Sequence, residues 1–147
     1  MSSYRPQVLT NQFFVLASGS PRRREFMELL GLTFVVITPA SPQVTKINGN
    51  AINETPLPGE APPDLVQRLS RIKAEAVAKA LPSLDLSSFG APVTPTQAVV
   101  IGADTIVVLE DKILGKPNGP AGAVQMLKNL REQPHFVYSG LSFWAYD

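Results

Sequence analysis

The feature that most constrains the fold is a strand followed directly by a helix near the start of the chain. Residues 13–16 form an apolar run with the composition of a buried strand, and residues 25–31 have the pattern of a helix. Ser20 stands where a helix N-cap belongs, Pro21 where the first helical residue belongs, and Gly31 where a helix ends. The sequence therefore predicts a strand, a tight turn and a helix in immediate succession.

The turn before this helix is rich in groups that bind anions. Residues 17–24 contain two serines and three consecutive arginines. Free backbone N–H groups at a helix start, hydroxyls and guanidinium groups together suit a polyphosphate. The same residues are also compatible with the exposed start of an ordinary helix, where arginines oppose the helix dipole only mildly. The local pattern leaves both interpretations open.

Length and composition describe one globular domain. A chain of 147 residues builds one core, and a net charge of +1 provides no chain-wide basic surface for nucleic acid. The sequence contains no cysteine and one histidine, His135, so a metal would need oxygen ligands, as Mg²⁺ or Mn²⁺ does. No apolar segment reaches the roughly 20 residues that span a bilayer. We therefore expect a cytoplasmic protein without nucleic-acid or membrane partners.

The first half of the chain predicts the start of an α/β sheet. We expect a disordered N-terminus over residues 1–12, a second buried strand over 33–37 and a long loop over 38–63. A helix is predicted over 64–81. Its apolar stripe comprises Leu65, Leu69, Ile72, Ala76 and Ala80. Lys73 borders this stripe, so it either covers the edge of the core or points into a site.

A central strand with an acidic end is predicted next. Residues 98–103 form the most apolar run of the chain, which indicates a strand that ends at Asp104. Functional groups in α/β sheets gather at strand ends, so Asp104 is either a catalytic or metal-binding acid or the cap of a turn. A hairpin with an acidic turn is predicted over 106–114.

The remaining residues predict a helix and an aromatic strand. Residues 121–130 have helical spacing with an inward apolar face. That face comprises Val124, Leu127 and Leu130. Residues 135–146 have the composition of a strand, with a bulge at Ser139 and Gly140 and an unpaired edge.

Six elements of the sequence follow one another in a distinctive order. They are residues 16–23, 68–74, 101–107, 114–117 and 123–127, followed by His135. In this order they resemble the motifs of the Maf family of nucleoside triphosphate pyrophosphatases, and the resemblance extends from Phe14 to Phe143. It implies a mixed central sheet with flanking helices, akin to inosine-triphosphatase-like proteins, in a domain over residues 13–147.

The resemblance also implies an activity and a site. The expected reaction converts a non-standard or pyrimidine nucleoside triphosphate to the monophosphate and pyrophosphate with Mg²⁺ or Mn²⁺, a house-cleaning step of nucleotide metabolism. The general base would be Asp104, which would also bind the metal, and Thr105 and Arg23 would influence substrate choice. The phosphate-binding residues would be Ser18, Ser20, Arg22, Arg23, Lys73 and Lys116.

The sequence departs from the family pattern in two places. Members carry acids shortly after the second strand, where Pro42 and Gln43 stand here, so Glu54 or Glu60 would need to reach back to the metal. Members also continue with a glycine-rich Asp-Lys-Ala-Gly segment, so we expect a domain that is incomplete at its C-terminus. Two hypotheses remain: an active pyrophosphatase, with a homodimer as its candidate assembly, and a truncated nucleotide-binding or interaction module without catalysis.

Overall fold

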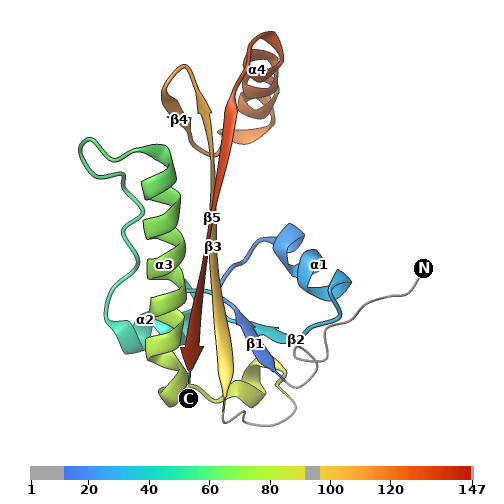
Figure 1. Ribbon diagram of the computed structural model, residues 1–147, viewed down its shortest axis with the longest axis vertical. Helices are drawn as coiled ribbons and strands as arrows, with labels where there is room; N and C mark the ends of the chain where they lie inside the picture. Colours follow the sequence, from blue (N-terminus) through green and yellow to red (C-terminus); the bar gives the residue numbers. More distant parts are fainter. Residues whose placement is uncertain (1–11, 92–96, 147) are drawn as a thin grey trace.

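The computed structural model describes residues 12–91 and 97–146, which form one mixed five-stranded sheet with helices on both faces (Figure 1). The predicted mixed α/β fold is confirmed. The strands are β1 (Phe13–Leu16), β2 (Thr33–Val36), β3 (Ala98–Leu109), β4 (Lys112–Leu114) and β5 (Phe136–Tyr146). The helices are α1 (Pro21–Leu29), α2 (Pro42–Asn48), α3 (Pro62–Ala80) and α4 (Gly119–Glu132). The predicted disorder over residues 1–12 falls, except for Gln12, outside the described residues.

The strand, turn and helix at the start of the chain form as predicted. Strand β1 pairs in parallel with both β2 and β3. Helix α1 begins at Pro21, directly after Ser20 in the N-cap position, although the Ser20 side chain makes no capping hydrogen bond. The helix buries Met27 in one cluster with Leu16 and Ile101, which fixes α1 against one face of the sheet.

The predicted loop over residues 38–63 is wrong in part, because it contains α2. The side chain of Ser41 accepts a hydrogen bond from the backbone N–H of Val44, and Gly49 ends the helix in the left-handed region at φ 77°. Val44 is the buried residue of α2. A helix of seven residues with one buried side chain shows no apolar periodicity, so only its two ends could have revealed it.

Helix α3 forms as predicted and buries three residues of the expected stripe, Leu65, Leu69 and Ala80. Ile72 and Ala76 are only half-buried. The buried face comprises Leu65, Val66, Leu69, Ser70, Ala74, Val77, Ala78 and Ala80. Small residues allow α3 to lie directly on β3 and β5: a methyl group added to Gly102 would approach the Ser70 carbonyl oxygen to 2.1 Å.

The predicted bulge at Ser139 and Gly140 is wrong. The antiparallel register between β3 and β5 is continuous from Ala98 to Val108. Gly140 is instead a point of close packing, since a methyl group there would lie 2.1 Å from the Val66 carbonyl oxygen of α3.

Strand β3 does not end at Asp104, as the sequence suggested, but continues to Leu109 before the predicted hairpin with β4. Strand β5 pairs along one edge of β3 over 98–108, so β1 and β4 share the other edge. Because β1 pairs with residues 99–101 and β4 with 107–109, residues 102–106 have no strand partner on that edge within the described sheet. Asp104 lies at the centre of this gap.

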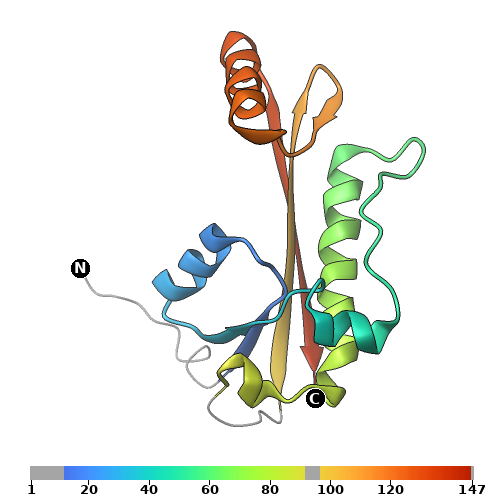
Figure 2. The same ribbon diagram turned by 180° about the vertical axis from the view of Figure 1, so that it is seen from behind.

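The far end of the β3–β5 ribbon carries β4 and α4 and projects from the rest of the molecule (Figure 2). Val124 and Leu127 do not point inward as predicted: their side chains are 52% and 66% exposed, and α4 buries no residue. Leu130, the third residue of the predicted face, is half-buried. None of the helices among the described residues is long and apolar enough to cross a membrane.

Candidate active site

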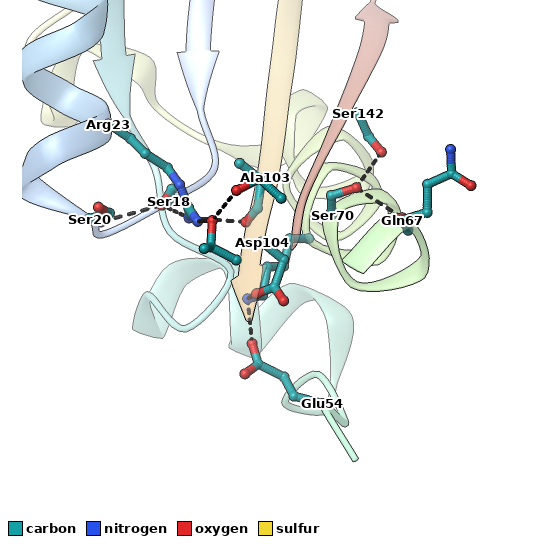
Figure 3. A network of polar contacts seen from close by, with 12 residues as sticks. Ser18, Ser20, Arg23, Glu54, Gln67, Ser70, Ala103, Asp104 and Ser142 are labelled. Atoms are coloured by element: carbon teal, nitrogen blue, oxygen red, sulfur yellow. Dashed lines mark hydrogen bonds and ion pairs between the residues drawn. The ribbon is translucent and has the colours of Figure 1, made fainter. Parts of the chain in front are cut away.

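The candidate site lies at the gap on the edge of β3 and uses both faces of that strand. Side chains alternate along a strand, so Asp104 points toward α3 while its neighbour Thr105 points toward α1. The first face contributes an ion pair, and the second contributes hydrogen bonds from the Arg23 guanidinium to uncharged oxygen acceptors (Figure 3).

On the α3 face, Lys73 joins two carboxylates. Its ammonium Nζ lies 2.6 Å from Oδ1 of Asp104 and 2.8 Å from Oε1 of Glu54. The side chains of Lys73 and Asp104 are 16% and 13% exposed, whereas that of Glu54 is 57% exposed. Burial lowers the pKa of Lys73, but hydrogen bonds and charge attraction from the two carboxylates outweigh it and raise the pKa above its ordinary 10.5. The Lys73 ammonium is therefore directed at these two carboxylates.

On the α1 face, Arg23 fills the gap beside β3. Its Nη1 donates to Oγ of Ser18 at 2.8 Å and to the carbonyl oxygen of Ala103 at 3.1 Å. Its Nη2 donates to Oγ1 of Thr105 at 3.2 Å. Arg23 thus fastens the serine-rich turn to the central strand across 80 residues of sequence.

Ser139 is a residue of this network that sequence reasoning missed as a site candidate. Its hydroxyl lies 2.8 Å from that of Thr105, its partner in the β3–β5 register. The guanidinium of Arg23 can only donate, so the Thr105 oxygen accepts from it and the Thr105 proton can be donated to Ser139. Only knowledge of the strand register could have identified this contact.

A cleft of about 440 Å³ opens beside these groups. It is lined by Ala17, Ser18, Gly19, Thr38, Pro39, Ala40, Ala51, Ile52, Glu54, Lys73 and Lys116. Lys116 lies on the segment between β4 and α4 and is exposed. The exposed Arg22 and the half-buried Ser20 at the start of α1 lie outside the cleft lining, and so do Arg23, Asp104 and Thr105. The backbone N–H of Ser20 donates to the Ser18 hydroxyl at 3.3 Å.

The two acids on the loop before α3, Glu54 and Glu60, have different partners. Glu54 forms an ion pair with Lys73 at the site, whereas Glu60 forms one with Arg68 away from the site. Hydrogen bonds from Arg68 and from the backbone N–H of Leu57 lower the pKa of Glu60 to about 2. Only Glu54 joins Asp104.

The oxygen donors at the site fit Mg²⁺ or Mn²⁺ bound together with phosphate groups. Magnesium in nucleotide enzymes is commonly held by one or two carboxylates and by substrate phosphates. Asp104 and Glu54 supply two carboxylates at one ammonium group. The described residues contain no group of three metal-binding acids, histidines or cysteines, so a closed protein cage is not formed within them.

A mixed α/β sheet with a cleft lined by lysines, hydroxyls and one carboxylate is typical of proteins that bind phosphorylated ligands. Comparison with known sequences identifies the family. The model of the Maf-like protein family matches residues 13–147, and the chain therefore belongs to this family.

Curated relatives of the chain are bacterial proteins named dTTP/UTP pyrophosphatase. The one from Syntrophus aciditrophicus is 41% identical over 128 residues, which cover 87% of this chain and 50% of the relative. The one from Nitrosospira multiformis is 41% identical over 130 residues, with 88% and 57% covered. The one from Desulforamulus reducens is 43% identical over 128 residues, with 87% and 54% covered. The chain spans about half the length of the curated relatives it matches.

Proposed function

We propose that the chain acts as a nucleoside triphosphate pyrophosphatase, which releases pyrophosphate and leaves a nucleoside monophosphate. The observation that carries the proposal is the pair of ion pairs that Lys73 makes with Asp104 and Glu54, because Lys73 and Glu54 line one cleft together with Ser18. A pyrimidine triphosphate is the proposed substrate, because the relatives described above are named dTTP/UTP pyrophosphatase.

The cationic and hydroxyl groups are assigned to the triphosphate. Lys73, Lys116 and Ser18 line the cleft and can donate to phosphate oxygens, while Ser20 and Arg22 stand at the positive N-terminus of α1. The guanidinium of Arg23 has five N–H donors. Three of them form hydrogen bonds with protein oxygens, so two remain for the substrate. Its first task is to hold the turn on β3.

Asp104 is assigned the role of general base. In the proposed reaction, Asp104 takes a proton from a water molecule whose oxygen attacks the α-phosphorus. The bond from that phosphorus to the bridging oxygen breaks, and pyrophosphate leaves. Asp104 and Glu54 would hold Mg²⁺ or Mn²⁺, which neutralises phosphate charge when bound. Thr105, beside Arg23, is assigned to substrate choice.

The test is product analysis in water labelled with heavy oxygen. The chain is incubated with dTTP, UTP and a panel of other nucleoside triphosphates in the presence of Mg²⁺ or Mn²⁺. We expect pyrophosphate as a product, with the label in the monophosphate, because water attacks the α-phosphorus. Release of single phosphates would contradict the proposed reaction. A folded chain that binds UTP without turnover would support the alternative, a non-catalytic nucleotide-binding module.

Two further predictions from the sequence concern location and assembly. A cytoplasmic location is tested by cell fractionation of the tagged chain. A homodimer is tested by sedimentation of the purified protein. Neither prediction enters the proposed mechanism, because every group assigned to it belongs to one chain.

A further inference from the structure

The loop that carries Glu54 is fastened to α3 at several points. Nε and Nη2 of Arg68 donate to the two carboxylate oxygens of Glu60 at 2.6 and 2.9 Å. Nη2 of Arg68 also donates to the carbonyl oxygen of Thr55 at 3.1 Å. A single guanidinium therefore binds both the end of the loop and the residue that follows Glu54.

The same loop is closed by two contacts of its own. The backbone N–H of Leu57 donates to Oε2 of Glu60 at 2.9 Å. The side chain of Asn53 accepts from the backbone N–H of Thr55, also at 2.9 Å. Between α2 and α3 the chain has no regular secondary structure, so these contacts supply the order that a helix or strand would otherwise give.

The Arg68–Glu60 ion pair is more buried than Glu54, the carboxylate at the other end of the loop. The Glu60 side chain is 8% exposed and that of Arg68 is 27% exposed, whereas Glu54 is 57% exposed. An exposed carboxylate on an irregular loop gains little from one ion pair, because its side chain must be ordered to make it. Glu54 nevertheless lies 2.8 Å from Lys73. Arg68 and Lys73 both belong to α3, so one helix holds the loop and also provides the cation that Glu54 meets.

We propose that Arg68 and Glu60 are positioning residues whose ion pair holds Glu54 against Lys73 and Asp104. The proposal deepens the function proposed above and rests on it for the role given to Glu54. Neither Arg68 nor Glu60 touches the reacting groups; both act through the backbone of residues 54–57.

The test measures how readily Lys73 reacts with acetic anhydride, by mass spectrometry of the folded full chain. Glu60→Gln removes the charge that holds Arg68, so Glu54 leaves Lys73 more often. We expect Lys73 to be acetylated about two to five times faster, the range that corresponds to loss of a partly exposed ion pair. Glu54→Gln should give the same increase, and the double variant no more than either single variant. Arg68→Lys, which keeps the charge but loses the two-point contact, should change the rate in the same direction.

The matched control lies on the same helix. Glu75 pairs with Lys79 at 2.8 Å on α3, and Lys79 lies more than one turn beyond Lys73, so Glu75→Gln should speed acetylation of Lys79 and leave Lys73 unchanged. Lys79 should keep its wild-type rate in Glu60→Gln, which shows that the helix remains folded. An unchanged Lys73 rate in Glu60→Gln or in Glu54→Gln would overturn the proposal, as would fully additive effects in the double variant.

Turnover provides a separate measurement. At saturating UTP, Glu60→Gln should lower kcat, and adding Glu54→Gln should lower it no further. If the wild-type chain releases no pyrophosphate, the proposed function fails, while the acetylation of Lys73 still decides whether Arg68 and Glu60 position Glu54.

Discussion

The two faces of the β3–β5 ribbon differ in packing and in chemistry. The face toward α3 is close-packed, with Gly102 and Gly140 in contact with the helix backbone, and it carries the charged group of Lys73 and Asp104. The opposite face is covered by α1 only near β1, and along β5 it leaves large apolar side chains exposed. These are Val137, Leu141 and Phe143.

This difference divides the candidate site into a rigid part and an open part. Asp104 is directed at a helix that cannot shift without breaking the packing at Gly102, so its ion pair with Lys73 is held in place. Thr105, one residue further, accepts a hydrogen bond from the Arg23 guanidinium and shares one with the Ser139 hydroxyl, near solvent and without a carboxylate partner. The chemistry is assigned to the rigid face, and substrate choice to the open one.

The largest expected effect comes from filling the close contact on the α3 face. Gly140→Ala places a methyl group on the backbone of α3, and we expect a loss of about 3 kcal/mol in the free energy of unfolding, at the upper end for overpacking. Leu141→Ser changes the next residue on the exposed face and should cost within about 0.5 kcal/mol. Urea denaturation measures both. Equal free energies of unfolding for the two variants would contradict the difference in packing between the two faces.

The next effect comes from removing the charge at the centre of the rigid part. Lys73→Met leaves Asp104 and Glu54 without their cation and should cost about 2 kcal/mol, somewhat less than for a fully buried pair, because Glu54 is half exposed. The pKa of Lys73 is raised in the folded protein, so its contribution is complete below the ordinary value of 10.5 and is lost as the pH rises through the folded-state pKa. The stability difference from wild type should therefore narrow above pH 10.5. A constant difference at high pH would contradict the ion pair.

The smallest expected effect on the free energy of unfolding comes from substituting two serines of β5 that point to opposite faces. Ser142 lies 2.7 Å from the hydroxyl of Ser70, which is fully buried, so Ser142→Ala should cost about 1 kcal/mol. Ser139→Ala, on the open face, should cost less than about 0.5 kcal/mol. Thermal denaturation of the two variants side by side provides the measurement, and the reverse order would show that the open face is the more tightly packed one.

Local signals in the sequence were sufficient to predict the turn and helix that carry the first candidate site residues. The turn before α1 is defined by Ser20 and Pro21, neighbours whose preferences do not depend on the rest of the fold. Asp104 was recognised from the apolar run before it, although β3 continues past it. A carboxylate is tolerated inside this strand because Lys73 neutralises it from a helix that precedes it by 31 residues, which no local pattern reveals.

The remaining features depend on register and on packing partners. The contact of Arg23 with Thr105 requires β1 to pair with residues 99–101 of β3, and the contact of Thr105 with Ser139 requires the β3–β5 register. The choice between Glu54 and Glu60 depends on Arg68, which binds one acid and leaves the other for Lys73. Periodicity in α4 identified an apolar face but could not say whether the fold covers it.

The central claim is that Asp104, held on the rigid face, acts as the base of a pyrophosphatase. The most direct measurement compares pyrophosphate release from UTP by the wild-type chain and by Asp104→Asn, with UTP binding measured for both. The account predicts a rate at least about 100-fold lower for Asp104→Asn, as expected for loss of a general base, with UTP binding retained. Equal rates of pyrophosphate release by the two proteins would contradict it.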